Sequence, residues 1–305
     1  MAKGNLWIGL IAGVIIYFIM TVYGDYGKVL AAISSFCIEY IPVLLALAFT
    51  NYLLRAVKWH YFFKVLSLDI SFKENLYVFL SGLLMAVTPG KFGEVWKSWL
   101  VRDLRGYDLH RTLPIVFIDR ITDVVAMLTL ATFGVFVFRV SILSFSLVVA
   151  ILLSMLMVLR SKTIMLKIFN MSARFEGMRK AYICSLALLR LQPFFLAVLI
   201  SLVAWFMECL AFYLTFRGLS VEAGLFESTF IYAISSVAGA LTMLPGGLGV
   251  TEASLAGLSS HLLMLDKSTT VAVTFIIRAV TLWFAVGVGA ISYFVGGRLL
   301  YQKSA

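Results

Sequence analysis

Apolar runs of about 20 residues recur along the whole chain, and they constrain its fold more than any other feature. Runs of this length can cross the ~30 Å hydrocarbon core of a bilayer as helices. Because 62% of the residues are hydrophobic and 13% are charged, little is left to form an aqueous domain. We therefore expect an all-α polytopic membrane protein, one integral membrane domain, with about six full spans near residues 4–23, 38–57, 113–138, 141–159, 194–216 and 269–297.

Charge and cysteine content exclude several other classes of protein. The net charge of +10 would suggest nucleic-acid binding in a soluble chain, but here it fits loops that face anionic headgroups, so no nucleic-acid partner is expected. Cys37, Cys184 and Cys209 are widely spaced in apolar runs, which predicts neither a disulfide framework nor a metal site. The chain carries no phosphate-binding loop for ATP. We expect no cofactor.

The distribution of basic residues predicts the orientation. Lys and Arg near the ends of spans accumulate in the cytoplasm. A cytoplasmic N-terminus places most of the 25 Lys and Arg residues on the cytoplasmic side. The sequence therefore predicts a multi-pass protein of the cell (plasma) membrane with both termini in the cytoplasm.

Two further apolar stretches, 73–104 and 228–264, are each interrupted by a Pro-Gly pair. In the predicted orientation each stretch begins and ends on one side of the membrane, so each forms a hairpin. The first enters from the cytoplasmic side and the second from the opposite side. Residues 73–88 would form a helix of only ~24 Å at 1.5 Å per residue. This length favours re-entrant hairpins over short double crossings, although the connectivity allows both.

The two hairpins share a sequence pattern. Thr88-Pro-Gly-Lys-Phe-Gly-Glu94 and Leu244-Pro-Gly-Gly-Leu-Gly-Val-Thr-Glu252 both place a glycine and then a glutamate after the break, and an intramembrane arginine follows, Arg120 or Arg278. Residues 1–140 and 141–305 are therefore predicted to be repeats of inverted topology, joined by a basic cytoplasmic linker at 160–182. Inverted repeats are typical of secondary transporters. Chance coincidence in a glycine-rich chain is the alternative.

The breaks and the buried charges predict a site for an anion. Glycine and proline end one half-helix and let the next begin near the midplane, where its N-terminus suits a phosphate; the alternative is a kink that only helps packing. The predicted hinge residues are Pro89, Gly90, Gly93, Pro245, Gly246, Gly247 and Gly249. Arg120 and Arg278 are predicted to hold the headgroup together with these N-termini.

Other charged residues extend this site. Lys91 and Lys97 make the mouth of a cavity basic, and Arg55 and Lys58 suit either a lipid phosphate or an ordinary interfacial belt. Charges at helix centres cost roughly 2.5–3.5 kcal/mol each on insertion scales, so Asp119, Asp123 and Glu208 are predicted to serve in ion pairs or in proton coupling. Glu94 and Glu252 also lie near helix starts, where they suit the positive end of the dipole.

At Thr88–Glu94, at Asp119-Arg120 with Asp123, and at Pro245–Glu252, the sequence resembles the lysylphosphatidylglycerol synthase transmembrane-region family. The resemblance covers almost the whole chain. It implies a flippase-like module in which Glu94, Arg120, Glu252 and Arg278 line the headgroup path. The aminoacyl-transferase domain of the full-length synthases is not recognised in this sequence, so we do not expect synthase activity.

These observations predict translocation of an anionic phospholipid or a polyprenyl-phosphate-linked lipid. The expected partners are membrane lipids with anionic headgroups and a lipid-modifying enzyme, and the oligomeric state is open. An integral-membrane glycosyl- or headgroup transferase with a carboxylate as general base is the alternative. A membrane scaffold is a third functional class, but it does not explain the inverted repeat.

Overall fold

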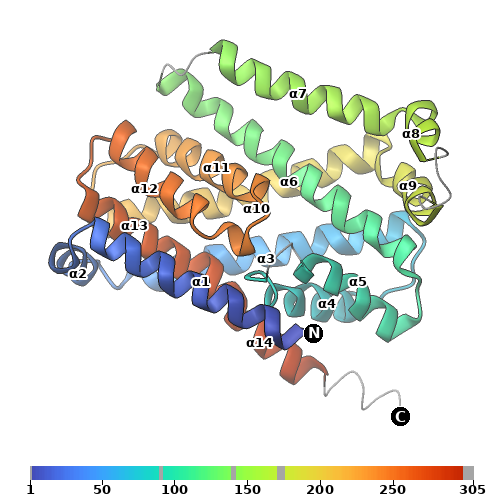
Figure 1. Cartoon of the computed structure of the whole chain (residues 1–305), viewed down its shortest axis with the longest axis horizontal. Coiled ribbons are helices and arrows are strands. Elements are labelled where there is room, and N and C mark those ends of the chain that lie inside the picture. Colours follow the sequence, from blue (N-terminus) through green and yellow to red (C-terminus); the bar gives the residue numbers. More distant parts are fainter. Residues whose placement is uncertain (1, 89–91, 139–141, 170–175, 298–305) are drawn as a thin grey trace.

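The computed structural model describes residues 2–88, 92–138, 142–169 and 176–297, and every regular element in these ranges is a helix (Figure 1). The all-α architecture predicted from the sequence is confirmed. The helices of residues 1–140 are α1 (Ala2–Tyr23), α2 (Tyr26–Ser34), α3 (Tyr40–Val65), α4 (Phe72–Leu83), α5 (Phe92–Arg105) and α6 (Leu109–Val137). Those of residues 141–305 are α7 (Ile142–Arg160), α8 (Lys162–Phe169), α9 (Glu176–Leu188), α10 (Leu191–Gly218), α11 (Leu225–Leu241), η3 (Pro245–Gly247), α12 (Val250–Leu262), α13 (Lys267–Arg278), η4 (Ala279–Trp283), α14 (Phe284–Ile291) and η5 (Ser292–Gly296).

Three helices of the described chain are long and apolar enough to cross a membrane: α3, α10 and the continuous run Lys267–Gly296. Two bent pairs, α1 with α2 and α7 with α8, raise this number to five if each pair is one span. Helix α6 is 29 residues long but carries charged residues in its interior. Apolar side chains of α7, such as Ile151, Leu153 and Met157, are exposed, as expected of a surface that faces lipid.

The predicted hairpins are formed by α4 with α5 and by α11 with α12. Their legs contain 12, 14, 17 and 13 residues, which corresponds to roughly 18–26 Å of helix, less than the ~30 Å hydrocarbon core. These lengths favour re-entrance, which stays a prediction.

The second break is wider than a Pro-Gly pair. Helix α11 ends at Leu241, and Met243, Gly246, Gly247 and Gly249 all have positive φ. Glycine adopts such backbone angles without steric cost, which explains why three of these four residues are glycines. Of the first break, Pro89, Gly90 and Lys91 lie outside the described residues.

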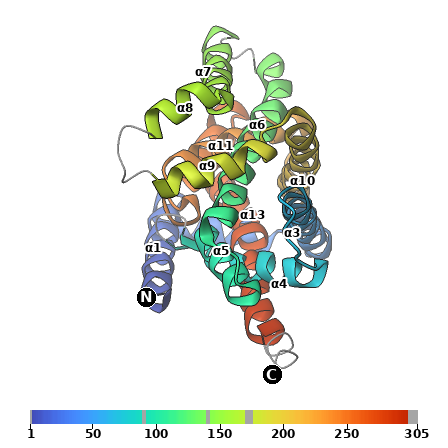
Figure 2. The ribbon, with the colours of Figure 1, turned by 90° about the vertical axis from the view of Figure 1, so that its right-hand side faces the viewer.

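Each hairpin packs on the last span of the other half of the chain. Helix α4 contacts α14 and η5, while α11 contacts α6, and α3 lies along α10 (Figures 1 and 2). The hairpins enter from opposite ends in Figure 1 and their tips meet: a Cβ added to Gly246 would lie 3.6 Å from the carbonyl oxygen of Ala86. Val87 and Leu248, one from each tip, share a small buried cluster with Leu282.

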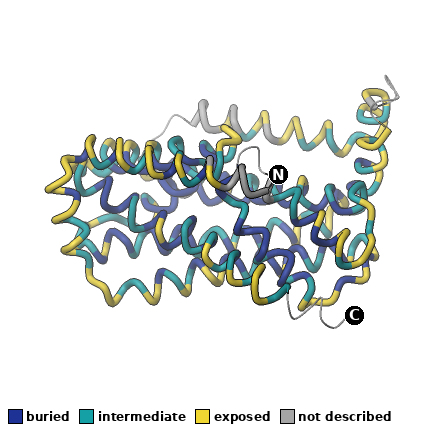
Figure 3. The backbone as a smooth tube through the Cα atoms, turned by 60° about the horizontal axis from the view of Figure 1, so that its bottom comes forward, coloured by how far each residue is buried: buried dark blue, intermediate teal, exposed yellow. Residues whose placement is uncertain are grey.

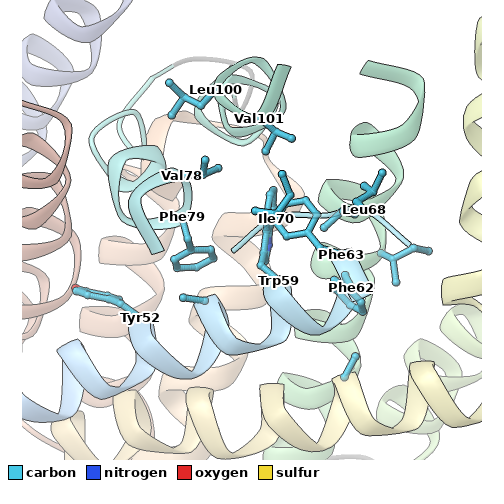
Figure 4. Packing of buried hydrophobic residues seen from close by; sticks show 14 of the residues in the cluster. Tyr52, Trp59, Phe62, Phe63, Leu68, Ile70, Val78, Phe79, Leu100 and Val101 are labelled. Atoms are coloured by element: carbon cyan, nitrogen blue, oxygen red, sulfur yellow. The ribbon is translucent and has the colours of Figure 1, made fainter. Parts of the chain in front are cut away.

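Buried residues concentrate along the inner helices (Figure 3). One large cluster surrounds the C-terminal end of α3, which we predict to face the cytoplasm. There the ring of Trp59 packs edge to face against the rings of Phe63 and Phe79 (Figure 4). This packing anchors the first hairpin against α3.

Candidate functional site

A buried network of charges connects α3 with α6. The ammonium of Lys58 lies 2.7 Å from Asp119 Oδ1 and 2.6 Å from Asp123 Oδ1, and Arg55 Nη2 lies 3.3 Å from Asp123 Oδ2. Residues three or four apart share one face of a helix, so the two basic residues of α3 meet the two aspartates of α6 along a single line of contact. The network thus satisfies charges that are costly inside a membrane.

Helix α10 completes this network from the other half of the chain. Ser201 Oγ accepts a hydrogen bond of 2.7 Å from Lys58 and donates one of 2.9 Å to Asp123. Lys58 also contacts Thr122 Oγ1 and is fully buried. With these partners its ammonium is fully engaged.

Arg120 joins the network to the first hairpin. Its Nη2 lies 2.6 Å from Asp119 Oδ2, 3.0 Å from Asp123 Oδ2 and 3.5 Å from Glu94 Oε1. Lys97 Nζ lies 3.6 Å from Glu94 Oε2 and sits over the rings of Phe79 and Trp59, at 4.3 and 4.7 Å from their centroids. The side chain of Lys97 crosses Gly82 of α4, where any Cβ would collide with it. A glycine at this position allows the two legs to pack around the lysine.

In the second half, the backbone of the break holds Arg278. Its Nε lies 2.6 Å from Glu252 Oε1, and its Nη2 donates a hydrogen bond of 2.7 Å to the carbonyl of Gly246. The other carboxylate oxygen of Glu252 accepts a hydrogen bond of 2.6 Å from the N–H of Gly249, which caps α12. The positive end of α12 is therefore already matched by a carboxylate, and Arg278 is held by both the side chain and the break.

A π-helical turn follows Arg278 directly. It spans Ala279–Trp283, and the hydroxyl of Tyr52 on α3 donates a hydrogen bond to its Thr281 carbonyl. Such turns widen a helix locally and are frequent at functional sites. Nearby, the hydroxyl of Tyr232 on α11 donates a hydrogen bond of 2.5 Å to Glu208 Oε2 on α10.

These elements surround one cavity of about 210 Å³ between the two hairpin tips. Its lining includes four basic side chains, Arg55, Lys97, Arg120 and Arg278, and two carboxylates, Glu94 and Glu208. The Nε atoms of Arg55 and Arg120 are buried and have no hydrogen-bond acceptor among the described residues. Guanidinium and ammonium groups that line a cavity can bind an anion by charge-assisted hydrogen bonds.

The family model for the lysylphosphatidylglycerol synthase TM region matches residues 6–289. The chain belongs to this family. It is 25% identical over 225 residues to a UPF0104 membrane protein of Methanocaldococcus jannaschii, a match that covers 72% of this chain and 96% of that protein. A UPF0104 membrane protein of Methanothermobacter thermautotrophicus is 32% identical over 93 residues, which cover 30% of this chain and 28% of that protein. Membership supports a multi-pass membrane protein with a function related to membrane lipids.

The structure brings most of the predicted site residues of this family member together. Arg55, Glu94, Lys97, Arg120, Glu208, Gly246, Gly247 and Arg278 line the cavity. Asp119, Asp123 and Glu252 lie behind it as ion-pair partners, while Pro245 and Gly249 form the ends of the second break. Gly93 belongs to the first turn of α5, and Lys91 lies outside the described residues with Pro89 and Gly90. Lys58 does not line the cavity, so we leave it out of the proposed headgroup site.

Sequence reasoning missed three aromatic residues of the lining, Tyr52, Trp205 and Tyr232. For two of them, the spacing along the sequence could have indicated a place in the site. Tyr52 precedes Arg55 by three positions and Trp205 precedes Glu208 by three, so each shares a helix face with a predicted site residue. Arg55 also lies over the Trp205 ring, with its Cζ 5.2 Å from the centroid. Tyr232 had no comparable signal, because no other predicted site residue lies on α11.

Proposed function

We propose that the protein translocates a lipid with an anionic headgroup across the membrane and that the cavity holds the headgroup in transit. One observation carries this proposal: Arg and Lys side chains from both halves, whose N–H groups are strong donors, line one cavity. A phosphate needs such donors. Both lipid classes considered, phospholipids and polyprenyl-phosphate-linked lipids, present one.

The size of the cavity supports a headgroup rather than a whole lipid. Pockets for drug-sized ligands have volumes of about 300–1,000 Å³, and this cavity has about 210 Å³. The hydrocarbon tails would therefore stay in the bilayer while the headgroup passes between the hairpin tips. Because Glu252 already caps α12, we assign headgroup binding mainly to Arg55, Arg120 and Arg278 and less to the helix N-termini.

The arrangement of the two halves supports alternating access. The hairpins enter from opposite ends, and each packs on the last span of the other half of the chain. If the two halves rock against each other, this arrangement would open the cavity to one side of the membrane at a time. This mechanism requires residues 1–140 and 141–305 to act as inverted repeats. We propose the same orientation as above, with both termini in the cytoplasm and the protein in the plasma membrane, where a lipid-modifying enzyme would supply the substrate.

Reconstitution tests this proposal directly. The purified protein is placed in phosphatidylcholine vesicles that contain a trace of phosphatidylglycerol labelled on an acyl chain, and a membrane-impermeant reductant measures the label in the outer leaflet. We expect the protein to move label between leaflets without a donor substrate. Arg278→Gln should abolish this movement, since it removes a cavity cation.

Two further variants control this test. Arg190 is exposed at the start of α10, so Arg190→Gln should retain full movement. The double variant Glu252→Gln with Arg278→Gln replaces both charged residues of the buried pair by neutral ones, so it should fold yet remain inactive. Undiminished movement in a folded double variant contradicts the site. A product that forms only with an added glycosyl or headgroup donor would favour the transferase instead.

A further inference from the structure

Glu208 differs from the other carboxylates of the cavity region. Glu94, Asp119, Asp123 and Glu252 each have a Lys or Arg nitrogen within 4.0 Å. Among the described residues, no such nitrogen lies within that distance of Glu208. Its side chain lines the cavity, and the residue is only 5% exposed. It is therefore a buried acid in contact with the proposed headgroup site but outside the ion-pair network.

The groups around Glu208 come from every helix packed on this part of α10. Tyr232 of α11 donates its hydrogen bond. Arg55 and Tyr52 face it from α3, Arg278 from α13 and Asp123 from α6, and Cys209 follows it on α10. The two arginines attract negative charge to this region, but each is already paired, Arg55 with Asp123 and Arg278 with Glu252.

A headgroup phosphate bound to Arg55 and Arg278 would change the surroundings of this carboxylate. It would add negative charge nearby and engage the two cations whose field favours the ionised acid. Like charges in a desolvated site favour the protonated form. Binding of the anion would therefore draw a proton onto Glu208, and departure of the anion would release it.

We infer that Glu208 is a proton-binding site that couples lipid movement to proton movement, with one proton carried per headgroup. This inference rests on the proposed function. A phosphodiester headgroup carries one negative charge, so the headgroup and the proton cross together without net charge, which lowers the cost of passing a polar group through the membrane. Asp119 and Asp123, the other candidates for coupling, are held by Lys58 and Arg120 and take no part in this step.

The vesicles described above test the inference when a pH difference is set across the membrane. Valinomycin and equal potassium on both sides hold the membrane potential at zero. Because protons run toward the alkaline side, acyl-labelled phosphatidylglycerol should accumulate in the leaflet that faces the alkaline solution. With one proton per lipid, its leaflet ratio should change about tenfold for each unit of pH difference.

Glu208→Gln keeps an acceptor for Tyr232 but cannot take up a proton, so in this variant the leaflet ratio of the lipid that moves should not depend on the pH difference. The matched control is Glu222→Gln, an exposed acid in the loop before α11, which should respond like the wild type. Tyr232→Phe provides a second measurement that leaves Glu208 in place. Because it removes the hydrogen bond that favours the ionised acid, the pH dependence of movement should shift toward higher pH.

The outcomes separate the two proposals. If the leaflet ratio of the wild type does not depend on the pH difference, proton coupling is overturned but translocation is not. The same holds if the leaflet ratio of Glu208→Gln still follows the pH difference. Absence of any wild-type lipid movement overturns both. If Glu208→Gln does not fold, an unchanged pH dependence in Tyr232→Phe overturns the assignment to Glu208.

Discussion

Arg120 and Arg278 follow matching hairpins, and each pairs with the glutamate of its own hairpin, but their surroundings differ. Within the described part of the chain Arg278 has a single acidic partner, Glu252, at 2.6 Å, and its side chain is 8% exposed. Arg120 shares three carboxylates at 2.6–3.5 Å, and its side chain is 27% exposed. Two further cations, Arg55 and Lys58, reach the same aspartates.

This difference separates two ways of keeping a charge inside a membrane. In the second half, one buried pair and a backbone carbonyl hold a single arginine in one position. In the first half, several cations share several carboxylates, so one contact can break while others remain. We therefore expect the first half to rearrange more easily around a bound headgroup, and the second half to depend on its one pair.

The largest effect should come from breaking the pair of the second half. Arg278→Gln leaves Glu252 buried without a cation, and the loss of one member of a buried pair costs about 3–5 kcal/mol. Arg120→Gln should cost less than half as much, because Lys58 and Arg55 still neutralise Asp119 and Asp123. Unfolding by SDS in mixed micelles measures both free energies.

The double variant Glu252→Gln with Arg278→Gln serves as the control for this prediction. It removes both charges together, so most of the stability lost in the single variant should return. If Arg120→Gln proves as destabilising as Arg278→Gln, then the first network is no more redundant than the second pair.

A smaller effect should separate the two lysines of the first half. Lys58→Met removes a fully engaged ammonium behind the cavity and should cost about 2 kcal/mol, in the range for hydrogen bonds to charged groups, while the folded protein still moves lipid. Lys97→Met removes a cavity cation and should slow lipid movement more strongly than it lowers stability. SDS unfolding and the vesicle assay, applied to both variants, check this division. If lipid moves more slowly in Lys58→Met than in Lys97→Met, the headgroup does not bind where we propose, in the cavity beside Lys97.

The comparison also shows what the sequence could predict. Two Pro-Gly breaks with a following glutamate and arginine predicted the hairpins and the residues near their tips, because Pro and Gly act locally and charges rarely enter a membrane without a partner. The partners themselves depend on packing between distant segments. Ser201 meets Lys58 across 143 positions, and Arg278 meets the Gly246 carbonyl, contacts that no spacing along the chain indicates.

The break of the second hairpin gives a prediction of moderate size. Gly249 has φ +88°, and a Cβ there would meet only Ile16 at 3.5 Å, so the cost of Gly249→Ala is that of the backbone angle, about 1–3 kcal/mol. Gly257 lies within α12, and a Cβ there would meet nothing within 4 Å. Gly257→Ala should therefore stabilise the protein by up to about 1 kcal/mol. SDS unfolding of the two alanine variants measures both changes, and a stabilising Gly249→Ala would show that the break does not require glycine.

The smallest effect concerns the open ends of the hairpins, outside the spans. Ser71 and Glu74 form a capping box at the start of α4, and Arg105 at the end of α5 binds both oxygens of Glu74 at 2.8 Å. The N-cap of α11, Gly224, makes no side-chain cap hydrogen bond. The first hairpin is thus clamped at its open end by a device that the N-cap of the second does not provide.

This clamp should depend on pH. Partial burial raises the pKa of Glu74, but hydrogen bonds from Arg105 and Ser71 outweigh it, so the pKa lies below its ordinary value of 4.5. A lowered pKa means that the clamp stabilises the fold above pH 4.5 and that this contribution is lost as the pH falls through the folded-state pKa. Glu74→Gln should therefore cost less than about 1 kcal/mol at neutral pH, as expected for a partly exposed pair. Its difference from the wild type in SDS unfolding should shrink as the solution is acidified. A difference that stays constant from pH 7 to strongly acidic solution would mean that the ion pair contributes nothing and that the clamp is only the uncharged part of the capping box.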